Sequence, residues 1–174
     1  MHQISDLISI FDNTFYQNYQ TRLIRGDDEP IYLPADKENN FHRIIFAHGY
    51  YASGLHEIAH WLIAGEQRRL IEDYGYWYCP DGRTEIEQAE FEKVEIKPQA
   101  IEWALCMAAG FKFNVSADNL NGEQPCRVSF QQKVHQQVLT YIENGFCQRT
   151  QALLKAFSDF YQTPWPLTEQ RFNW

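Results

Sequence analysis

Residues 46–61 read FAHGYYASGLHEIAHW, and a helix is predicted to begin within this stretch. Its apolar residues recur three and four positions apart, which is the spacing of one helix face. That face comprises Leu55, Ile58, Ala59 and Leu62. Gly65 weakens a helix without necessarily ending it. The pattern therefore predicts a helix over about residues 53–73, preceded by a β-branched and aromatic strand at residues 43–47.

The predicted helix contains the pattern HExxH, with His56, Glu57 and His60 as its polar members. Residues four positions apart lie on one face, so both imidazoles can reach the same metal ion. Glu57 lies about 100° around the axis from His56, which suits a base beside a metal-bound water. Such residues can also form an ordinary solvated face, but the neighbouring side chains here are apolar. We therefore predict a metal site, with Glu57 in a catalytic role.

Two histidines need a third protein ligand, and the stretch FEKVEIKPQAIEW (91–103) offers three glutamates: Glu92, Glu95 and Glu102. Glutamates are usually solvent-exposed. Glu95, however, lies between Val94 and Ile96, where a carboxylate without a cation would be costly. We therefore predict Glu95 as the third ligand, with His48 and His135 as weaker candidates.

The identity of the metal stays open between two chemistries. A zinc ion with one bound water would make the protein a small HExxH peptidase, with Glu57 as general base. Two histidines and a carboxylate also hold Fe(II) and leave positions open for dioxygen and substrate. A third alternative is a non-catalytic binding module, with a structural metal or none.

The remaining pattern predicts a mostly helical α+β fold with a small β-sheet, forming one domain over residues 1–174. Apolar spacing predicts further helices at about residues 5–20, 84–110, 128–144 and 150–162. Pro98 marks a kink or a new first turn within the second of these. Residues 22–36 read as a loop with a short extended piece at residues 31–33.

The composition of the chain indicates which classes of partner are not expected and in which compartment the protein acts. The 174 residues carry 15 Lys and Arg against 23 Asp and Glu, a formal charge of −8. No basic cluster accompanies this charge, so direct nucleic-acid binding is not expected. No apolar run approaches the roughly 18 residues of a membrane span. The four cysteines are widely spaced and no signal peptide is evident, which favours reduced thiols in the cytoplasm.

Two loops supply candidate substrate contacts. A run of carboxylates is usually a solvated surface, but in a loop it can also bind an ammonium group. The aromatic loop GYWYCPDGR (75–83) can line a cleft or simply form a turn. The candidate substrate-binding residues, together with the histidine after the predicted strand, are Asp27, Asp28, Glu29, His48, Tyr76 and Asp81.

Five stretches in this order resemble the bacterial elongation factor P hydroxylase family: GDDEPIYLPAD (26–36), FAHGYYASGLHEIAHW (46–61), GYWYCPDGR (75–83), FEKVEIKPQAIEW (91–103) and FNVSADNL (113–120). The resemblance runs from about residue 5 to the C-terminal tail. It implies a cytoplasmic non-heme-metal enzyme whose protein substrate is translation elongation factor P. The expected product is a hydroxylated lysine that already carries a β-lysyl group. The resemblance further implies dioxygen as co-substrate and a 2-His-1-carboxylate site, with Fe(II) held by His56, His60 and Glu95.

Overall fold

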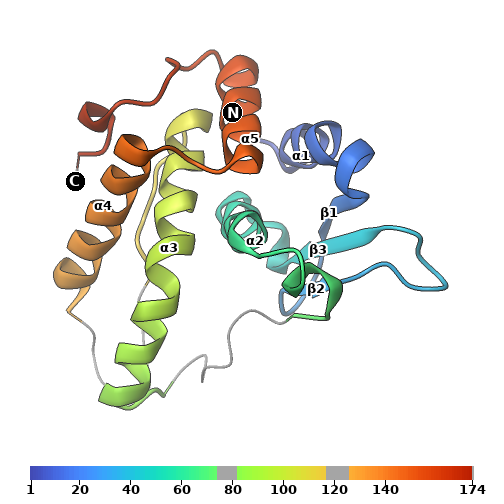
Figure 1. The fold of residues 1–174 in the computed structure, drawn as a ribbon, viewed down its shortest axis with the longest axis horizontal. Helices are drawn as coiled ribbons and strands as arrows, with labels where there is room; N and C mark the ends of the chain where they lie inside the picture. The colour runs from blue at the N-terminus through green and yellow to red at the C-terminus, as the bar shows by residue number, and fades with distance from the viewer. Residues whose placement is uncertain (74–81, 117–125, 174) are drawn as a thin grey trace.

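A three-stranded sheet supports the helix that carries the histidine pair (Figure 1). The computed structural model describes residues 1–73, 82–116 and 126–173. Within these residues the strands are β1 (Thr21–Arg25), β2 (Ile31–Leu33) and β3 (His42–Phe46). Their order is β1-β3-β2, and the central strand β3 is parallel to β1 and antiparallel to β2.

Strand β1 corrects the prediction of a loop in this region. Leu23 of β1 pairs in register with Ile44 of β3, and both side chains are buried. The five residues of β1 are too few to show a clear alternation, and a loop rich in carboxylates follows them. Their strand conformation depends on pairing with β3, which local sequence does not reveal. The extended segments predicted at residues 31–33 and 43–47 are confirmed as β2 and β3.

Helices make up most of the described chain. They are α1 (Ile4–Tyr19), α2 (Tyr51–Ile63), α3 (Glu85–Ala109), α4 (Arg127–Asn144) and α5 (Gln148–Tyr161). Short 3₁₀ turns also occur at η1 (Ala47–Gly49), η2 (Arg68–Leu70) and η3 (Glu169–Arg171). In Figure 1, α2 lies between the sheet and α3, and α4 flanks α3 on its other side. The predicted α+β fold with mostly helical content is confirmed.

A close approach fixes the first half of α2. A β-carbon on Gly54 would meet Leu7 Cδ2 at 2.6 Å and the Phe46 ring at 3.6 Å. Leu7 lies on α1 and Phe46 ends β3, so α2 contacts both elements where only glycine leaves room. Leu55 and Ile58 continue the same apolar face and are fully buried. The histidine helix is therefore packed directly against the core.

Helix α2 ends at Ile63, so the predicted extension to residue 73 was wrong. Ala64 adopts an extended conformation, with φ −64° and ψ 126°. Arg149 of α5 donates hydrogen bonds to three carbonyl oxygens at this end. The acceptors belong to Trp61, Leu62 and Ala64, at 2.9, 3.1 and 2.8 Å. The last carbonyls of a helix lack partners within it, and here a distant guanidinium supplies them.

Helix α3 runs unbroken through Pro98, so the predicted alternative of a new first turn at this residue was wrong. It begins with a capping box, in which Thr84 and Glu87 each bond the backbone N–H of the other. Gly110 follows its last residue with φ 65°, a left-handed conformation that ends the helix. Because α3 is continuous, residues several turns apart keep a fixed relation to α2.

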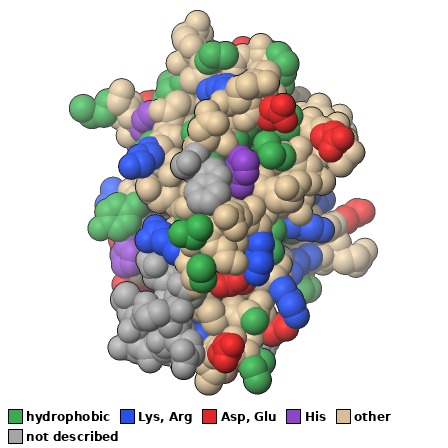
Figure 2. Space-filling model, turned by 90° about the vertical axis from the view of Figure 1, so that its left-hand side faces the viewer, with side chains coloured by type: hydrophobic (Ala, Val, Ile, Leu, Met, Phe, Trp, Pro, Cys, Tyr) green, Lys and Arg blue, Asp and Glu red, His purple; other side chains and the backbone are tan. Residues whose placement is uncertain are grey.

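The surface agrees with the mixed charge of the sequence. Figure 2 shows basic and acidic side chains interspersed on the face that α4 forms.

In the described part of the chain, none of the helices combines the length and the apolar character that a membrane span requires. Three cysteines in this part, Cys106, Cys126 and Cys147, are free thiols.

The Arg149 contacts predict a measurable contribution to stability. We expect Arg149→Met to lower the free energy of unfolding by about 2 kcal/mol, because hydrogen bonds from a charged donor contribute roughly 1.5–3 kcal/mol and do not add fully. Urea denaturation followed by circular dichroism measures the change. Lys155→Met on the same helix is the control, since its exposed pair with Asp159 contributes at most about 0.5 kcal/mol. Equal losses in the two variants would contradict the assignment.

Candidate metal centre

Helices α2 and α3 bring His56, His60 and Glu95 together. One donor atom of each lies within 4.8 Å of the donor atoms of the other two. The Nε2 atoms of His56 and His60 are 3.1 Å apart. Glu95 Oε1 lies 3.2 Å from His60 Nε2, and Glu95 Oε2 lies 3.6 Å from His56 Nε2. The predicted ligand set therefore converges on one point, although its three members come from two helices separated by a long stretch of chain.

Glu95 shows that this cluster fits a cation. Its side chain is 1% exposed, and Oε1 is buried without a well-aligned hydrogen bond. The other oxygen, Oε2, accepts a hydrogen bond from Gln99 at 3.3 Å. A carboxylate in the interior is costly unless its charge is compensated, and a cation bound beside the two imidazoles would compensate that charge. Two imidazoles and one carboxylate also form a common donor set for divalent transition metals.

Neighbouring charges control protonation in the cluster. Burial opposes the charged form of His56, but the hydrogen bond and charge of Glu102, with the charges of Glu95 and Glu57, raise its pKa to about 10. Burial also opposes the ionised form of Glu95, but the imidazoles of His60 and His56 lower its pKa. These charges therefore favour the imidazolium form of His56, which carries one proton more than the neutral ring, in the metal-free cluster. A metal ion would displace this proton, because a ligating imidazole is neutral.

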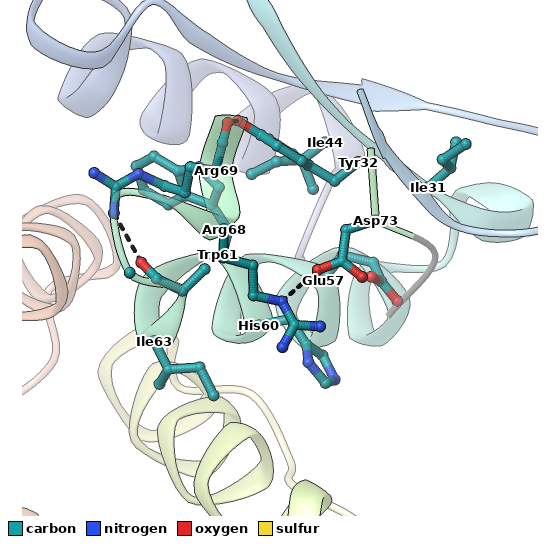
Figure 3. Close-up of a pocket in the computed structure, with 12 residues that line it drawn as sticks. Ile31, Tyr32, Ile44, Glu57, His60, Trp61, Ile63, Arg68, Arg69 and Asp73 are labelled. Atoms are coloured by element: carbon teal, nitrogen blue, oxygen red, sulfur yellow. Dashed lines mark hydrogen bonds and ion pairs between the residues drawn. The ribbon is translucent and has the colours of Figure 1, made fainter. Parts of the chain in front are cut away.

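A cavity of about 290 Å³ opens on the sheet side of α2 (Figure 3). His60, one of the predicted ligands, forms part of its wall, so the cavity lies beside one member of the cluster. Arg68 and Asp73 also line it, and Arg68 Nε lies 2.5 Å from Asp73 Oδ2. Among described residues, the complete lining is Ile31, Tyr32, Ile44, Glu57, His60, Trp61, Ile63, Ala64, Gly65, Arg68, Arg69 and Asp73.

Glu57 lines this cavity beside His60, its neighbour one helical turn away. Burial raises the pKa of Glu57, although the imidazoles of His56 and His60 act in the opposite direction. A carboxyl group with a raised pKa exchanges a proton more readily near neutral pH than an exposed glutamate does. The structure thus places Glu57 where it can act on a molecule in the cavity, and its catalytic role stays a prediction.

The other candidates occupy different positions. Glu92 is directed at Lys133 of α4, 3.5 Å away, and does not join the cluster. His135 bonds the carbonyl oxygen of Phe172 at 2.7 Å, also away from the cluster. The side chain of His48 is exposed in η1. The backbone N–H of His48 donates a hydrogen bond to the carbonyl oxygen of Asp27 at 3.3 Å.

Four of the six candidate substrate contacts lie in the described part of the chain, and they are not among the residues that line the cavity there. Asp27 contacts His48 through the backbone, and neither these two residues nor Asp28 and Glu29 line the cavity as described. Tyr76 and Asp81 lie outside the described residues. All six stay predictions.

Several residues near the cluster escaped prediction. Arg68 and Asp73 were placed within a longer α2, where they would not have turned back onto the cavity. Gln99 carried no local signal, because a glutamine on a helix is usually exposed. Glu102 was considered as a ligand, and its position seven residues after Glu95 indicates the same helix face. In the structure its Oε2 lies 2.9 Å from His56 Nδ1, on the ring edge away from the cluster.

Comparison with known proteins gives two findings that agree. Residues 10–172 match the family described as elongation factor P hydroxylase. A protein of Haemophilus influenzae named elongation factor P lysine hydroxylase is 52% identical over 172 residues, which cover 99% of this chain and 97% of the relative. The match therefore includes every described residue of the cluster and the cavity.

The cluster predicts stabilisation by a divalent metal. With Co²⁺ at about a hundred times its dissociation constant, we expect the free energy of unfolding to rise by about 2.7 kcal/mol. Glu95→Gln should remove most of this gain, because the amide oxygen carries no charge. Chemical denaturation with and without the metal measures it.

Glu92→Gln on the same helix is the matched control and should keep the full gain. If Co²⁺ stabilised the Glu95→Gln variant as much as the unmodified protein, Glu95 would not be a ligand.

Proposed function

The chain belongs to the elongation factor P hydroxylase family, and from this premise we propose that it hydroxylates a lysine side chain of translation elongation factor P. The observation that carries the proposal is the cluster of His56, His60 and Glu95, whose donor set suits oxygen chemistry and lies beside a cavity. The protein is then an oxidoreductase that acts in the cytoplasm, where translation factors are found. We further propose that the target lysine already carries a β-lysyl group.

We propose Fe(II) as the metal, held by Nε2 of His56, Nε2 of His60 and the Glu95 carboxylate. Iron with these three ligands supplies open positions for dioxygen and the oxidising power to cleave a C–H bond. In the overall reaction one oxygen atom enters the C–H bond, and the other leaves as water after taking up two electrons and two protons. Glu57, with its raised pKa and its place in the cavity wall, is proposed to hold and return one of these protons.

The cavity supports a lysine as the group that is modified. Its aliphatic walls, formed by Ile31, Ile44 and Ile63, suit the methylene chain of a lysine side chain. Asp73 lines the cavity as the partner of Arg68, and its carboxylate is proposed to exchange this partner for an amino group of the substrate. A volume near the lower limit of ligand pockets, roughly 300 Å³, accommodates one long side chain rather than a folded segment. Substrate protein would then remain outside while its lysine reaches the metal.

The first test is the mass of the proposed substrate. β-Lysylated elongation factor P, incubated aerobically with the Fe(II)-loaded protein and a reductant, should gain the mass of one oxygen atom. His60→Ala should abolish the gain, because it removes a ligand. Intact-mass spectrometry of the substrate provides the measurement, and circular dichroism checks that the variant remains folded.

Two other outcomes would support the alternative functions. Cleavage of a peptide bond that depends on Glu57, with no oxygen gain under any reductant, would identify a zinc peptidase. Binding of elongation factor P that survives loss of His56 and His60, again without a change in mass, would identify a non-catalytic module.

The second test concerns the cavity. Ile31 is half-buried on the edge strand β2 and lines the cavity. The larger side chain of Ile31→Trp should therefore narrow the cavity without disturbing the central strand. We expect kcat/KM for the substrate to fall by about tenfold or more, since misfit in an apolar pocket costs about this much. Leu33→Trp on the same strand is the control, because Leu33 is half-buried and does not line the cavity. Metal affinity should be unchanged in both variants; an unchanged kcat/KM for Ile31→Trp would exclude the cavity as the substrate route.

A further inference from the structure

We propose that Glu102 is a positioning residue, which holds His56 in the tautomer that presents Nε2 to the metal. The inference rests on the metal site of the proposed function and assigns a role to a residue outside the ligand set.

The contact between Glu102 and His56 defines the direction of the hydrogen bond. Glu102 Oε2 lies 2.9 Å from His56 Nδ1, and the carboxylate side chain is 10% exposed. An ionised carboxylate only accepts hydrogen bonds, so Nδ1 must carry the hydrogen. In the neutral imidazole the lone pair is then on Nε2. That atom faces His60 Nε2 at 3.1 Å and Glu95 Oε2 at 3.6 Å, which is the point where the ligand set converges.

The spacing along α3 explains why one helix can provide both functions. Glu95, Gln99 and Glu102 are separated by four and three residues, so they form one stripe along the helix. The stripe faces α2: Glu95 meets His60 and Glu102 meets His56. Each residue of the stripe thus contacts a different part of the cluster: Glu95 meets the histidines, Gln99 meets Glu95, and Glu102 meets His56.

Gln99 secures the middle of this stripe. Its amide donates to the Ser116 carbonyl oxygen at 2.6 Å and accepts from the Ser116 N–H at 3.0 Å. The same amide nitrogen lies 3.3 Å from Glu95 Oε2. Gln99 therefore restrains Glu95 in the absence of a metal, while Glu102 is held by its own contact with His56.

Glu102 acts through His56 rather than on the metal directly. Its nearest oxygen is engaged at Nδ1, whereas the donor atoms that converge include Nε2. Carboxylates that accept from a ligating histidine orient the ring and increase its basicity, and their loss commonly weakens metal binding about 10–100-fold. A purely structural Glu102 would instead affect folding and leave the affinity of the folded site unchanged.

The first experiment measures Co²⁺ affinity by competition with a chelator, together with the visible absorption of bound Co²⁺. We expect Glu102→Ala to weaken binding about 10–100-fold and to change the absorption spectrum. Glu102→Gln should retain more of the affinity, because its amide oxygen still accepts from Nδ1–H. Glu90→Gln is the control, being exposed on the same helix and paired with Lys93. Affinity and spectrum equal to those of the unmodified protein in Glu102→Ala would overturn the inference.

The second experiment needs no substitution and so does not depend on folding of a variant. In the Zn²⁺-loaded protein labelled with ¹⁵N, long-range ¹H–¹⁵N spectra distinguish a protonated ring nitrogen from a metal-bound one. His56 should show a proton on Nδ1 and metal on Nε2, whereas metal on Nδ1 would overturn the inference. If the unmodified protein bound neither Co²⁺ nor Zn²⁺, the metal site of the proposed function would itself fail, which is a different result.

Discussion

A carboxylate buried against two imidazoles is the interaction on which the arrangement of the helices depends. Glu95 is almost fully excluded from water, and an isolated buried charge of this kind would destabilise the fold by several kcal/mol. His56 and His60 offset part of that cost from the facing helix. Because the pair of histidines and the glutamate come from different elements, their contact holds α2 and α3 in one relative position. A metal ion bound between them would strengthen the same constraint.

Such a constraint is useful only if α2 cannot slide or rotate, and the chain restrains it at both ends. Near the start, Gly54 allows contact with α1 and β3 at a distance that leaves no room for a β-carbon. At the end, Arg149 occupies the terminal carbonyls from α5 and lies 4.6 Å from the centroid of the Trp61 ring. These contacts explain how a helix of only 13 residues can hold two predicted ligands in a fixed geometry. Metal centres need this support, because ligand positions tolerate little error.

Features that depend on residues near one another in the sequence were predictable, whereas features that depend on distant residues were not. The closeness of His56 and His60 was predictable because four-residue spacing is a local property of a helix. Glu95 was identifiable because its apolar neighbours made an unpartnered carboxylate improbable there. By contrast, β1 exists through pairing with β3, and α2 ends where Arg149 meets it from α5. Neither partner is near in sequence, so local patterns favoured a loop in one place and a longer helix in the other.

The early end of α2 also creates the cavity. A helix continuing to residue 73 would have carried Arg68 and Asp73 away from the cluster, whereas the turn after Ile63 returns them to the wall beside His60. The two sides of α2 then serve different purposes. Towards α3, His56 and His60 meet the acidic stripe; towards the sheet, Glu57 and His60 meet the cavity. His60 belongs to both sides, so the five residues of the HExxH motif join a ligand cluster to the space in which a substrate side chain can lie.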